Sequence, residues 1–220
     1  MIEKFEIELK RLTEVFIKKN KIVNLSSFND FESVWNKNIL DSLEVVNFLD
    51  FDFQNALDVG TGGGFPLLPL AICYPDKNWS GIDSVNKKLI AVEDMAAELG
   101  LKNIAAFHAR VEDFGHDSDF RESFDLVLSR AFAKLPMNLE LCLPLVKVGG
   151  RFVAMLGPSS QQEIDESVNQ YTELGCTLER FECVETEFGT RCFLILLKTA
   201  NTPTTFPRST KKIKKEFKIS

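Results

Sequence analysis

Hydrophobic and polar positions follow a helical period at the start of the chain. Apolar side chains recur at or near helical spacing in the first segment, at Phe5, Leu9, Leu12, Phe16 and Ile17. Lysine and arginine residues occupy positions between them. This pattern predicts an amphipathic helix over residues 1–21, because one face of such a helix is apolar. A second helix is predicted over residues 31–48.

After residue 50 the pattern changes to short apolar runs that alternate with longer segments of helical period. The apolar runs predict strands near residues 55–60, 79–83, 103–108, 124–129, 150–156, 176–184 and 191–198. Helices are predicted between the earlier strands, near residues 65–74, 85–100, 134–146 and 159–174. Strands that alternate with helices in this way form a mainly parallel sheet.

The last two predicted strands have no helix between them. Residues 185–190 separate them, which predicts a hairpin and therefore one antiparallel strand. A parallel sheet with a late antiparallel strand resembles the seven-stranded Rossmann-like fold of S-adenosylmethionine-dependent methyltransferases. We therefore predict an α/β protein with an N-terminal helical extension over 1–50, a methyltransferase domain over 51–198 and a basic C-terminal tail over 199–220.

Length and composition limit what the chain can do. Its 220 residues are 45% hydrophobic and 26% charged, which fits one well-buried catalytic domain with an extension. The net charge of −6 indicates that any nucleic-acid surface is local. The sequence has no signal peptide and no run of roughly 18 apolar residues. We therefore expect a soluble cytoplasmic protein that does not enter a membrane, and nothing in the sequence demands more than a monomer.

The cysteines predict thiols rather than disulfides or metal ligands. They are Cys73, Cys142, Cys176, Cys183 and Cys192. Their number is odd, they form no Cys-x-x-Cys pair, and most lie in apolar stretches. We expect reduced, buried core thiols of a cytoplasmic protein, and no metal site.

The segment Ala56-Leu-Asp-Val-Gly-Thr-Gly-Gly-Gly-Phe-Pro66 runs from an apolar strand into a loop rich in glycine. The glycines lack the Cβ atoms that would hold a ligand away from the backbone, and the N-terminus of the next helix points at the same place. A dinucleotide-binding fingerprint would require glycine at Phe65 or Leu67, the sixth position counted from Gly60 or Gly62. The spacing instead resembles the Asp-x-Gly-x-Gly-x-Gly loop of methyltransferases; a tight structural turn is the alternative.

Two acidic segments follow the next predicted strands, and ligands in open α/β sheets bind beyond such strand ends. Asp83 ends the second strand, where a carboxylate can accept both ribose hydroxyls of an adenosine. Its alternative role is as N-cap of the next helix, which Ser84 could fill instead. Arg110-Val-Glu112-Asp113 follows the third strand, at the position that holds the adenine in methyltransferases. Its acidic side chains could equally lie on a solvated surface.

An arginine follows the fourth predicted strand, in the segment Ser129-Arg130-Ala131-Phe132-Ala133. A charge directly beyond a buried apolar strand must meet water, a partner or a ligand. A structural salt bridge is the alternative to a ligand contact at Arg130.

With these segments the chain resembles the glucose-inhibited division protein B family, the bacterial methyltransferases of guanine N7 in small-subunit (16S) ribosomal RNA. The resemblance extends over nearly all of the chain. Its landmarks are Asn24-Leu-Ser26, Ile39-Leu-Asp-Ser-Leu43, Asp58-Val-Gly-Thr-Gly-Gly-Gly-Phe-Pro66, Asp83-Ser84, Arg110-Val-Glu112, Ser129-Arg-Ala-Phe-Ala133, Asn201-Thr-Pro203 and Phe206-Pro-Arg208. The family usually has other residues at Lys19, Asn38 and Leu156, and these departures bear on RNA contacts more than on the cofactor.

The resemblance implies S-adenosyl-L-methionine as cofactor and small-subunit ribosomal RNA or the 30S subunit as partner. The implied cofactor-binding residues are Gly60, Gly62, Gly64, Phe65, Asp83, Val111, Glu112 and Arg130. Arg130 is also the predicted catalytic residue, which would orient the substrate or the methionine carboxylate. Guanine N7 already carries an in-plane lone pair, so positioning suffices and no general base is needed. Neither His108 nor His116 is expected to act as a catalyst.

A basic, weakly ordered tail and the basic first helix are the predicted RNA contacts. The tail residues are Arg208, Lys211, Lys212, Lys214 and Lys215. The residues of the first helix are Lys10, Arg11, Lys18, Lys19 and Lys21, which could equally form a solvated face. Two other functions stay open: a methyltransferase acting on another RNA site or a small molecule, and a non-catalytic RNA-binding protein of ribosome assembly with the same fold. Phe65 disfavours a nicotinamide oxidoreductase.

Overall fold

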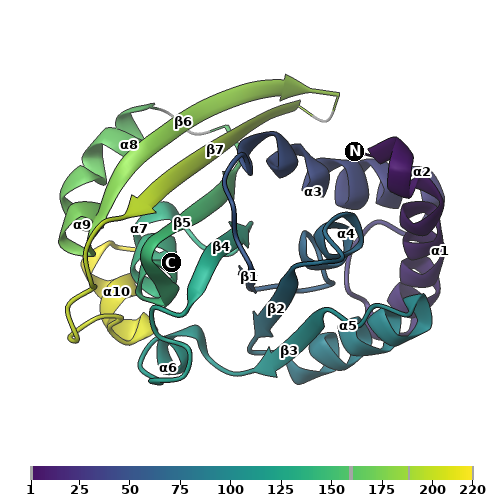
Figure 1. The fold of residues 1–220 in the computed structure, drawn as a ribbon, viewed down its shortest axis with the longest axis horizontal. Coiled ribbons are helices and arrows are strands. Elements are labelled where there is room, and N and C mark those ends of the chain that lie inside the picture. The colour runs from purple at the N-terminus through teal and green to yellow at the C-terminus, as the bar shows by residue number, and fades with distance from the viewer. Residues whose placement is uncertain (1, 159–160, 188, 220) are drawn as a thin grey trace.

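A seven-stranded sheet forms the centre of the computed structural model, which describes residues 2–158, 161–187 and 189–219 (Figure 1). Its strand order is β3-β2-β1-β4-β5-β7-β6. The strands are β1 (Asn55–Val59), β2 (Asn78–Asp83), β3 (Ile104–His108), β4 (Phe124–Arg130), β5 (Val146–Leu156), β6 (Cys176–Thr186) and β7 (Gly189–Lys198). Strands β1 to β5 pair in parallel, and β7 is antiparallel to both β5 and β6. The predicted fold class is confirmed.

Two strand boundaries differ from the prediction. β5 begins at Val146 rather than near residue 150. The glycines at 149 and 150 resemble a turn, so the sequence pattern did not predict a strand there. A Cβ at Gly150 would lie 2.7 Å from the carbonyl oxygen of Asp125 on the neighbouring strand. The β6–β7 hairpin is tighter than predicted, since Glu185 and Thr190 already pair within the ladder. Close backbone approach therefore explains why a strand can continue through residues that resemble a turn.

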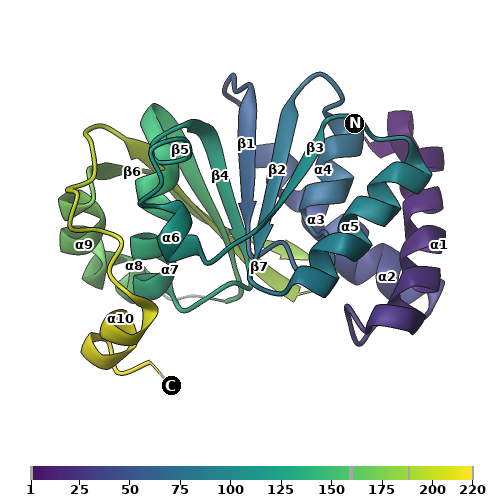
Figure 2. The same ribbon diagram turned by 90° about the horizontal axis from the view of Figure 1, so that it is seen from below.

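Helices cover both faces of the sheet, one group on each side in Figure 2. The α-helices are α1 (Glu6–Val23), α2 (Phe31–Val34), α3 (Asp41–Leu43), α4 (Leu67–Cys73), α5 (Asn86–Leu99), α6 (Val111–Phe114), α7 (Leu135–Cys142), α8 (Gln161–Glu166), α9 (Val168–Glu173) and α10 (Thr210–Glu216). The other helical turns are η1 (Ile2–Phe5), η2 (Trp35–Leu40), η3 (Glu44–Phe48) and η4 (Leu143–Leu145). The predicted start of a helix at 159–160 lies outside the described residues. None of the helices in the described ranges is long and apolar enough to cross a membrane.

The strands present alternate side chains to the two helical layers, as the period of two dictates. Ala56 and Leu126 lie in one core, with the buried side chains of α1, α4 and α5. Leu57 and Val127, one residue further along, lie in the other core with those of α7. The N-terminal helices and the C-terminal helix α10 therefore pack on opposite faces of one sheet.

The second predicted helix, over residues 31–48, is interrupted by the π-helix η2. Inside η2 the N–H of Asp41 donates to the carbonyl of Asn36, five residues back, and not to Lys37. The Lys37 carbonyl instead accepts a hydrogen bond of 2.7 Å from Arg130 at the end of β4. A tertiary contact thus takes the acceptor that a regular helix would use, which local sequence patterns cannot reveal.

The expectation of a weakly ordered tail is wrong, because residues 199–219 pack against the domain. Arg121 donates to the carbonyl oxygens of Phe206 at 2.8 Å and of Thr202 at 2.8 Å. On α10, Ile213 is fully buried in the second core. The sequence pattern did not predict this helix, because Ile213 is its single buried apolar residue among lysines.

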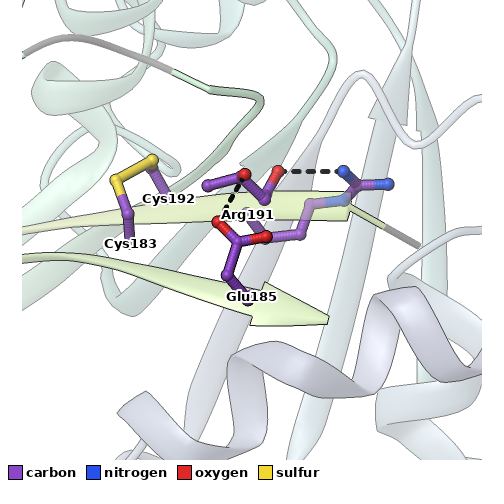
Figure 3. Close-up of a disulfide and its surroundings, with 5 residues drawn as sticks. Cys183, Glu185, Arg191 and Cys192 are labelled. Carbon is purple, nitrogen blue, oxygen red and sulfur yellow. Dashed lines mark hydrogen bonds between the residues drawn. A yellow bond between two sulfur atoms is a disulfide. The ribbon is translucent and has the colours of Figure 1, made fainter. Parts of the chain in front are cut away.

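One pair of cysteines departs from the predicted reduced state. Cys183 and Cys192 form a disulfide between β6 and β7, beside Glu185 and Arg191 (Figure 3). They lie directly opposite one another in the ladder, with Cα atoms 4.0 Å apart. This juxtaposition depends on the register of the hairpin, so spacing along the chain did not indicate it. Cys73, Cys142 and Cys176 are free and buried, as predicted.

Candidate active site

The glycine loop leaves β1 at the centre of the sheet, where β1 lies between β2 and β4. Gly60 has a φ of +73°, and its N–H donates to the carbonyl of Ile82 at 2.9 Å. A Cβ at this position would lie 2.5 Å from the ring of Phe132, which follows β4. Glycine is therefore required by both the backbone conformation and the approach of an aromatic ring.

A cavity of about 330 Å³ opens beside this loop at the carboxyl ends of the strands. It gathers four of the predicted cofactor residues: Gly60, Asp83, Val111 and Glu112. Ala131, Phe132 and Thr210 also line it. A ligand is expected at this place because the strand order reverses between β1 and β4.

Asp83 is 8% exposed and its two carboxylate oxygens accept backbone hydrogen bonds. Gly62 N–H donates to Oδ2 at 3.0 Å, and Val85 N–H donates to Oδ1 at 2.8 Å. These bonds fix the side chain at the cavity and tie the glycine loop to the end of β2. Each oxygen has a second lone pair for a ligand hydroxyl, so the predicted ribose contact fits the geometry.

Glu112 also lines the cavity, from the first turn of α6, and its carboxylate is held by two side chains. Oε1 accepts from Thr210 Oγ1 at 2.7 Å and from Arg110 Nη2 at 3.0 Å. Burial raises the pKa of Glu112, but the hydrogen bonds from Thr210 and Arg110 outweigh it and lower the pKa below its ordinary value. The group is therefore a charged acceptor near neutral pH. Together with Asp83 it suits the hydroxyl and amino groups of an adenosine.

Arg130 is engaged by the protein, as the salt-bridge alternative predicted. Its guanidinium lies 2.7 Å from Asp41 Oδ2 and donates to Ser42 Oγ at 2.9 Å. Burial lowers the pKa of Arg130, and the Asp41 charge opposes that shift. The arginine thus fastens the family landmark around residues 39–43 to the end of β4.

A second, smaller cavity of about 230 Å³ shares Ala131 with the first. It is lined by Asp41, Arg130, Ala131, Met155, Leu156, Gly157 and Arg191. Arg191 Nε lies 2.5 Å from Asp41 Oδ1, so one carboxylate bridges two arginines. Sequence reasoning missed Arg191, although a charge at the start of an apolar strand was a usable signal.

Four predicted cofactor residues do not line the first cavity: Arg130, which lines the second, and the loop residues Gly62, Gly64 and Phe65. The N–H of Gly62 donates to Asp83 Oδ2 and so helps to hold that carboxylate. At Gly64, φ is +90° and a Cβ would lie 2.6 Å from Leu68. Phe65 packs edge-on against Phe16 of α1, with ring centroids 4.8 Å apart. These three loop residues shape the loop and its contact with the N-terminal helix.

The predicted basic residues lie on α1 and in the C-terminal tail. On α1, Lys19 forms a 2.8 Å ion pair with Asp94, and Arg11 donates to the carbonyl of Glu98. In the tail, Arg208 binds Glu140, which is 1% exposed, at 2.7 Å. The exposed lysines of α10 are Lys211, Lys212, Lys214 and Lys215. Arg208 thus fits an anchor of the tail, and the lysines form its outward surface.

Neither histidine stands in either cavity. His108 Nε2 lies 3.1 Å from the carbonyl oxygen of Ser84, and His116 Nε2 lies 2.7 Å from that of Pro207. Both are in contact with backbone, at a strand end and in a loop, as expected. Within the described ranges no group of acidic, histidine and cysteine residues could hold a metal ion.

Solved structures share this fold at low sequence identity. Magnesium protoporphyrin IX methyltransferase from Synechocystis PCC 6803 superposes with a TM-score of 0.60 at 13% identity, covering 83% of this chain and 90% of that one. A variant of the 16S rRNA (adenine(1408)-N(1))-methyltransferase from Catenulisporales acidiphilia gives 0.58 at 16% identity, covering 68% and 87%. Fold and cavity together define the class at the level of architecture: the chain has the Rossmann-like α/β fold that these methyltransferases share, with a cavity at the carboxyl ends of β1, β2 and β4.

Sequence relatives narrow this class. The model of the family described as rRNA small subunit methyltransferase G matches residues 6–192. Ribosomal RNA small subunit methyltransferase G from Geobacillus sp. (strain WCH70) is 40% identical over 91% of this chain and 86% of its own. The protein of the same name from Bacillus subtilis (strain 168) is 37% identical over 94% and 86%. The chain belongs to the rRNA small subunit methyltransferase G family, which confirms the resemblance and the predicted cofactor class.

Proposed function

We propose that the protein transfers a methyl group from S-adenosylmethionine to N7 of a guanine in small-subunit (16S) ribosomal RNA. The observation that carries this proposal is the pair of cavities that meet at Ala131. Asp83 and Glu112 line one, and Arg130 and Arg191 line the other. Two cavities that share Ala131 in their linings are consistent with separate sites for the methyl donor and the acceptor base. Membership of the family supports ribosomal RNA as the acceptor.

The first cavity would hold the adenosine part of the cofactor. Asp83 would accept hydrogen bonds from the ribose hydroxyls. Val111 is the first residue of α6, so its N–H has no partner within the helix and can meet the adenine beside Glu112. Gly60 lets the loop backbone approach the ligand. When bound, S-adenosylmethionine supplies a methyl group on a positively charged sulfur as the electrophile.

The second cavity would orient the acceptor. Guanine N7 has no proton to lose, and the residues that line the two cavities include neither histidine nor cysteine in the described part of the chain. Catalysis then rests on holding N7 in line with the methyl carbon. In this proposal Arg130, held by Asp41, orients the substrate or the methionine carboxylate, and Arg191 supports it through the same carboxylate.

The exposed lysines of α10 would contact the RNA backbone. They project from a helix that is fixed by Ile213 and Arg208, so their positions are ordered in advance. The paired state of Lys19 and Arg11 makes α1 the weaker candidate. We further propose that the protein acts as a cytoplasmic monomer on small-subunit RNA or the 30S subunit.

Binding and label transfer test the proposal in sequence. Calorimetry should show binding of S-adenosylmethionine and none of NAD. Incubation with cofactor labelled at the methyl group and with undermethylated small subunits should then place label in the RNA. Binding of NAD would contradict the class of site, and cofactor binding without label in the RNA would contradict the acceptor.

A further inference from the structure

We propose that Thr210, in the C-terminal tail, is a positioning residue of the cofactor site because it sets the carboxylate of Glu112. The inference rests on the proposed function. It assigns part of the cofactor pocket to a segment that lies about a hundred residues further along the chain than α6. It also gives the tail a role in binding the cofactor, in addition to any contact with RNA.

The contacts at Glu112 carry the proposal. Thr210 Oγ1 donates to Glu112 Oε1 at 2.7 Å, and Arg110 Nη2 lies 3.0 Å from the same oxygen. Arg110 also reaches Thr210 Oγ1 at 3.4 Å, which orients the hydroxyl so that its proton points at the carboxylate. Both side-chain bonds to Glu112 in the described part of the chain use Oε1. Oε2 is therefore the oxygen that can accept a donor from the ligand.

Thr210 itself is on the wall of the cofactor cavity. Its hydroxyl and the Glu112 carboxylate thus face one volume of about 330 Å³ from two elements, the start of α10 and the start of α6. The Glu112 side chain is only partly buried, with 17% of its side-chain surface exposed. Without the hydroxyl it would be free to follow the exposed Arg110 side chain away from the cavity.

The tail holds Thr210 in place independently of this bond. Both the N–H and the guanidinium of Arg208 bind Glu140. His116 contacts the carbonyl oxygen of Pro207, and Ile213 is fully buried. Removing one hydroxyl should therefore leave the tail docked, so that a change in cofactor binding reports on Glu112 rather than on the loss of α10.

The test compares three variants of the full-length protein by calorimetry with S-adenosylmethionine. Thr210→Val keeps the shape and removes the hydroxyl, and we expect the affinity to fall about tenfold, as the loss of a hydrogen bond to a charged group implies. Thr210→Ser keeps the hydroxyl and should stay within about twofold of the unchanged protein. Thr204→Val, on an exposed tail residue, is the matched control and should change nothing.

Two further measurements distinguish a role of Thr210 in positioning Glu112 from a purely structural role. The melting temperature of the ligand-free Thr210→Val protein should stay close to that of the Thr204→Val control. The Thr210 hydroxyl helps to lower the pKa of Glu112, so its removal should raise that pKa. On acidification, the affinity of Thr210→Val for S-adenosylmethionine should therefore begin to fall at a higher pH than that of the unchanged protein. If Thr210 had only a structural role, Thr210→Val would have a lower melting temperature, and its affinity would depend on pH as in the unchanged protein.

The outcomes are distinct. Equal affinity of Thr210→Val and the unchanged protein overturns the role of Thr210, as does a loss of affinity that Thr210→Ser shares. A loss that only follows a fall in the melting temperature, with an unshifted pH profile, also overturns it. If the unchanged protein fails to bind S-adenosylmethionine, the proposed function itself is contradicted.

Discussion

At the scale of single residues, Gly60 shows how sterics and conformation together define the site. Gly60→Ala should place a methyl group against the Phe132 ring and force an L-residue to a φ of +73°. Gly100→Ala is a matched control, because Gly100 has a φ of +74° with nothing within 4 Å of its Cβ position. We expect both variants to lose about 1 kcal/mol of stability from the backbone, and Gly60→Ala to lose about 1–3 kcal/mol more from overpacking.

Thermal or denaturant unfolding measures this difference, and calorimetry with the cofactor should show weaker binding for Gly60→Ala alone. If both variants lost the same stability and kept the same affinity, the close approach at Gly60 would not matter.

Asp58, buried in β1, gives a prediction about pH. Burial raises its pKa to about 6 from an ordinary value near 3.8. The folded state therefore binds this proton more tightly than the unfolded state, so the stabilising contribution is complete below about pH 4 and is lost as pH rises through about 6. The shift corresponds to about 3 kcal/mol. Asp58→Asn removes the titration and keeps the shape.

The free energy of unfolding, measured from pH 4 to pH 7, tests this prediction. Relative to Asp58→Asn, the unchanged protein should lose stability across that interval. Parallel curves for the two proteins would contradict it.

Residue type, strand position and the family resemblance together predicted four residues that line the proposed cofactor cavity: Gly60, Asp83, Val111 and Glu112. Gly60 and Asp83 end predicted strands and Glu112 follows one, and parallel strands bring their carboxyl ends to one edge. Thr210 and Arg191 escaped prediction because they arrive from distant segments through tertiary packing. The sequence shows a hydroxyl at Thr210 and a charge at Arg191, but it does not show which residues they contact in the fold.

At the scale of elements, α10 is docked by a buried ion pair. Arg208 binds Glu140 of α7, and the hydrogen bonds that its guanidinium donates to Glu140 and Glu216 raise the pKa of Arg208. Arg208→Ala would remove the guanidinium and leave the buried Glu140 carboxylate with only the backbone N–H of residue 208 from that residue, so we expect a loss of about 3 kcal/mol in the free energy of unfolding. Lys211→Ala, on the exposed side of the same helix, should change stability by less than about 0.5 kcal/mol.

Chemical denaturation decides between these expectations. An Arg208→Ala protein as stable as Lys211→Ala would mean that the ion pair does not hold the tail.

Arg130 makes the corresponding connection on the other face, between β4 and the helical turns at residues 35–43. Arg130→Ala should lose methyl transfer and also about 3 kcal/mol of stability, since Asp41 is 3% exposed and keeps only Arg191. Turnover should be assayed well below the melting temperature of the variant. Near-normal turnover by the folded variant would contradict the role of Arg130.

Elements were predictable where local pattern determines them and not where tertiary contacts do. The central strands stand out because each contains a short apolar run, such as Phe124–Arg130. The helix expected over 31–48 is broken because Arg130 takes the carbonyl of Lys37. α10 was missed because a single apolar residue, Ile213, holds a helix made mostly of lysines.

At the scale of the whole molecule, a net charge of −6 coexists with one basic surface on α10. Replacing Lys211, Lys212, Lys214 and Lys215 by alanine should weaken RNA binding and lower the slope of log affinity against log salt by about three. Replacing Lys18 and Lys21 on α1 by alanine tests the alternative surface and should leave the slope nearly unchanged. The opposite pattern would move the RNA contacts to α1.

The division into an extension, a catalytic domain and a tail stays a prediction. Both flanking regions pack into the cores of the central sheet, α1 on one face and α10 on the other. The tail also lines the proposed cofactor cavity through Thr210. Cofactor binding and RNA binding are therefore expected to be coupled through α10, and such coupling is reciprocal.

The most direct test of the central claim locates the methyl group. Small subunits that lack the modification are incubated with the protein and S-adenosylmethionine, and the 16S RNA is then treated with borohydride and aniline, which cleave the chain at N7-methylguanine. We predict a new scission that depends on both the protein and the cofactor and is absent with Arg130→Ala. RNA that stays intact, or a methyl group found at a position other than guanine N7, would contradict the account.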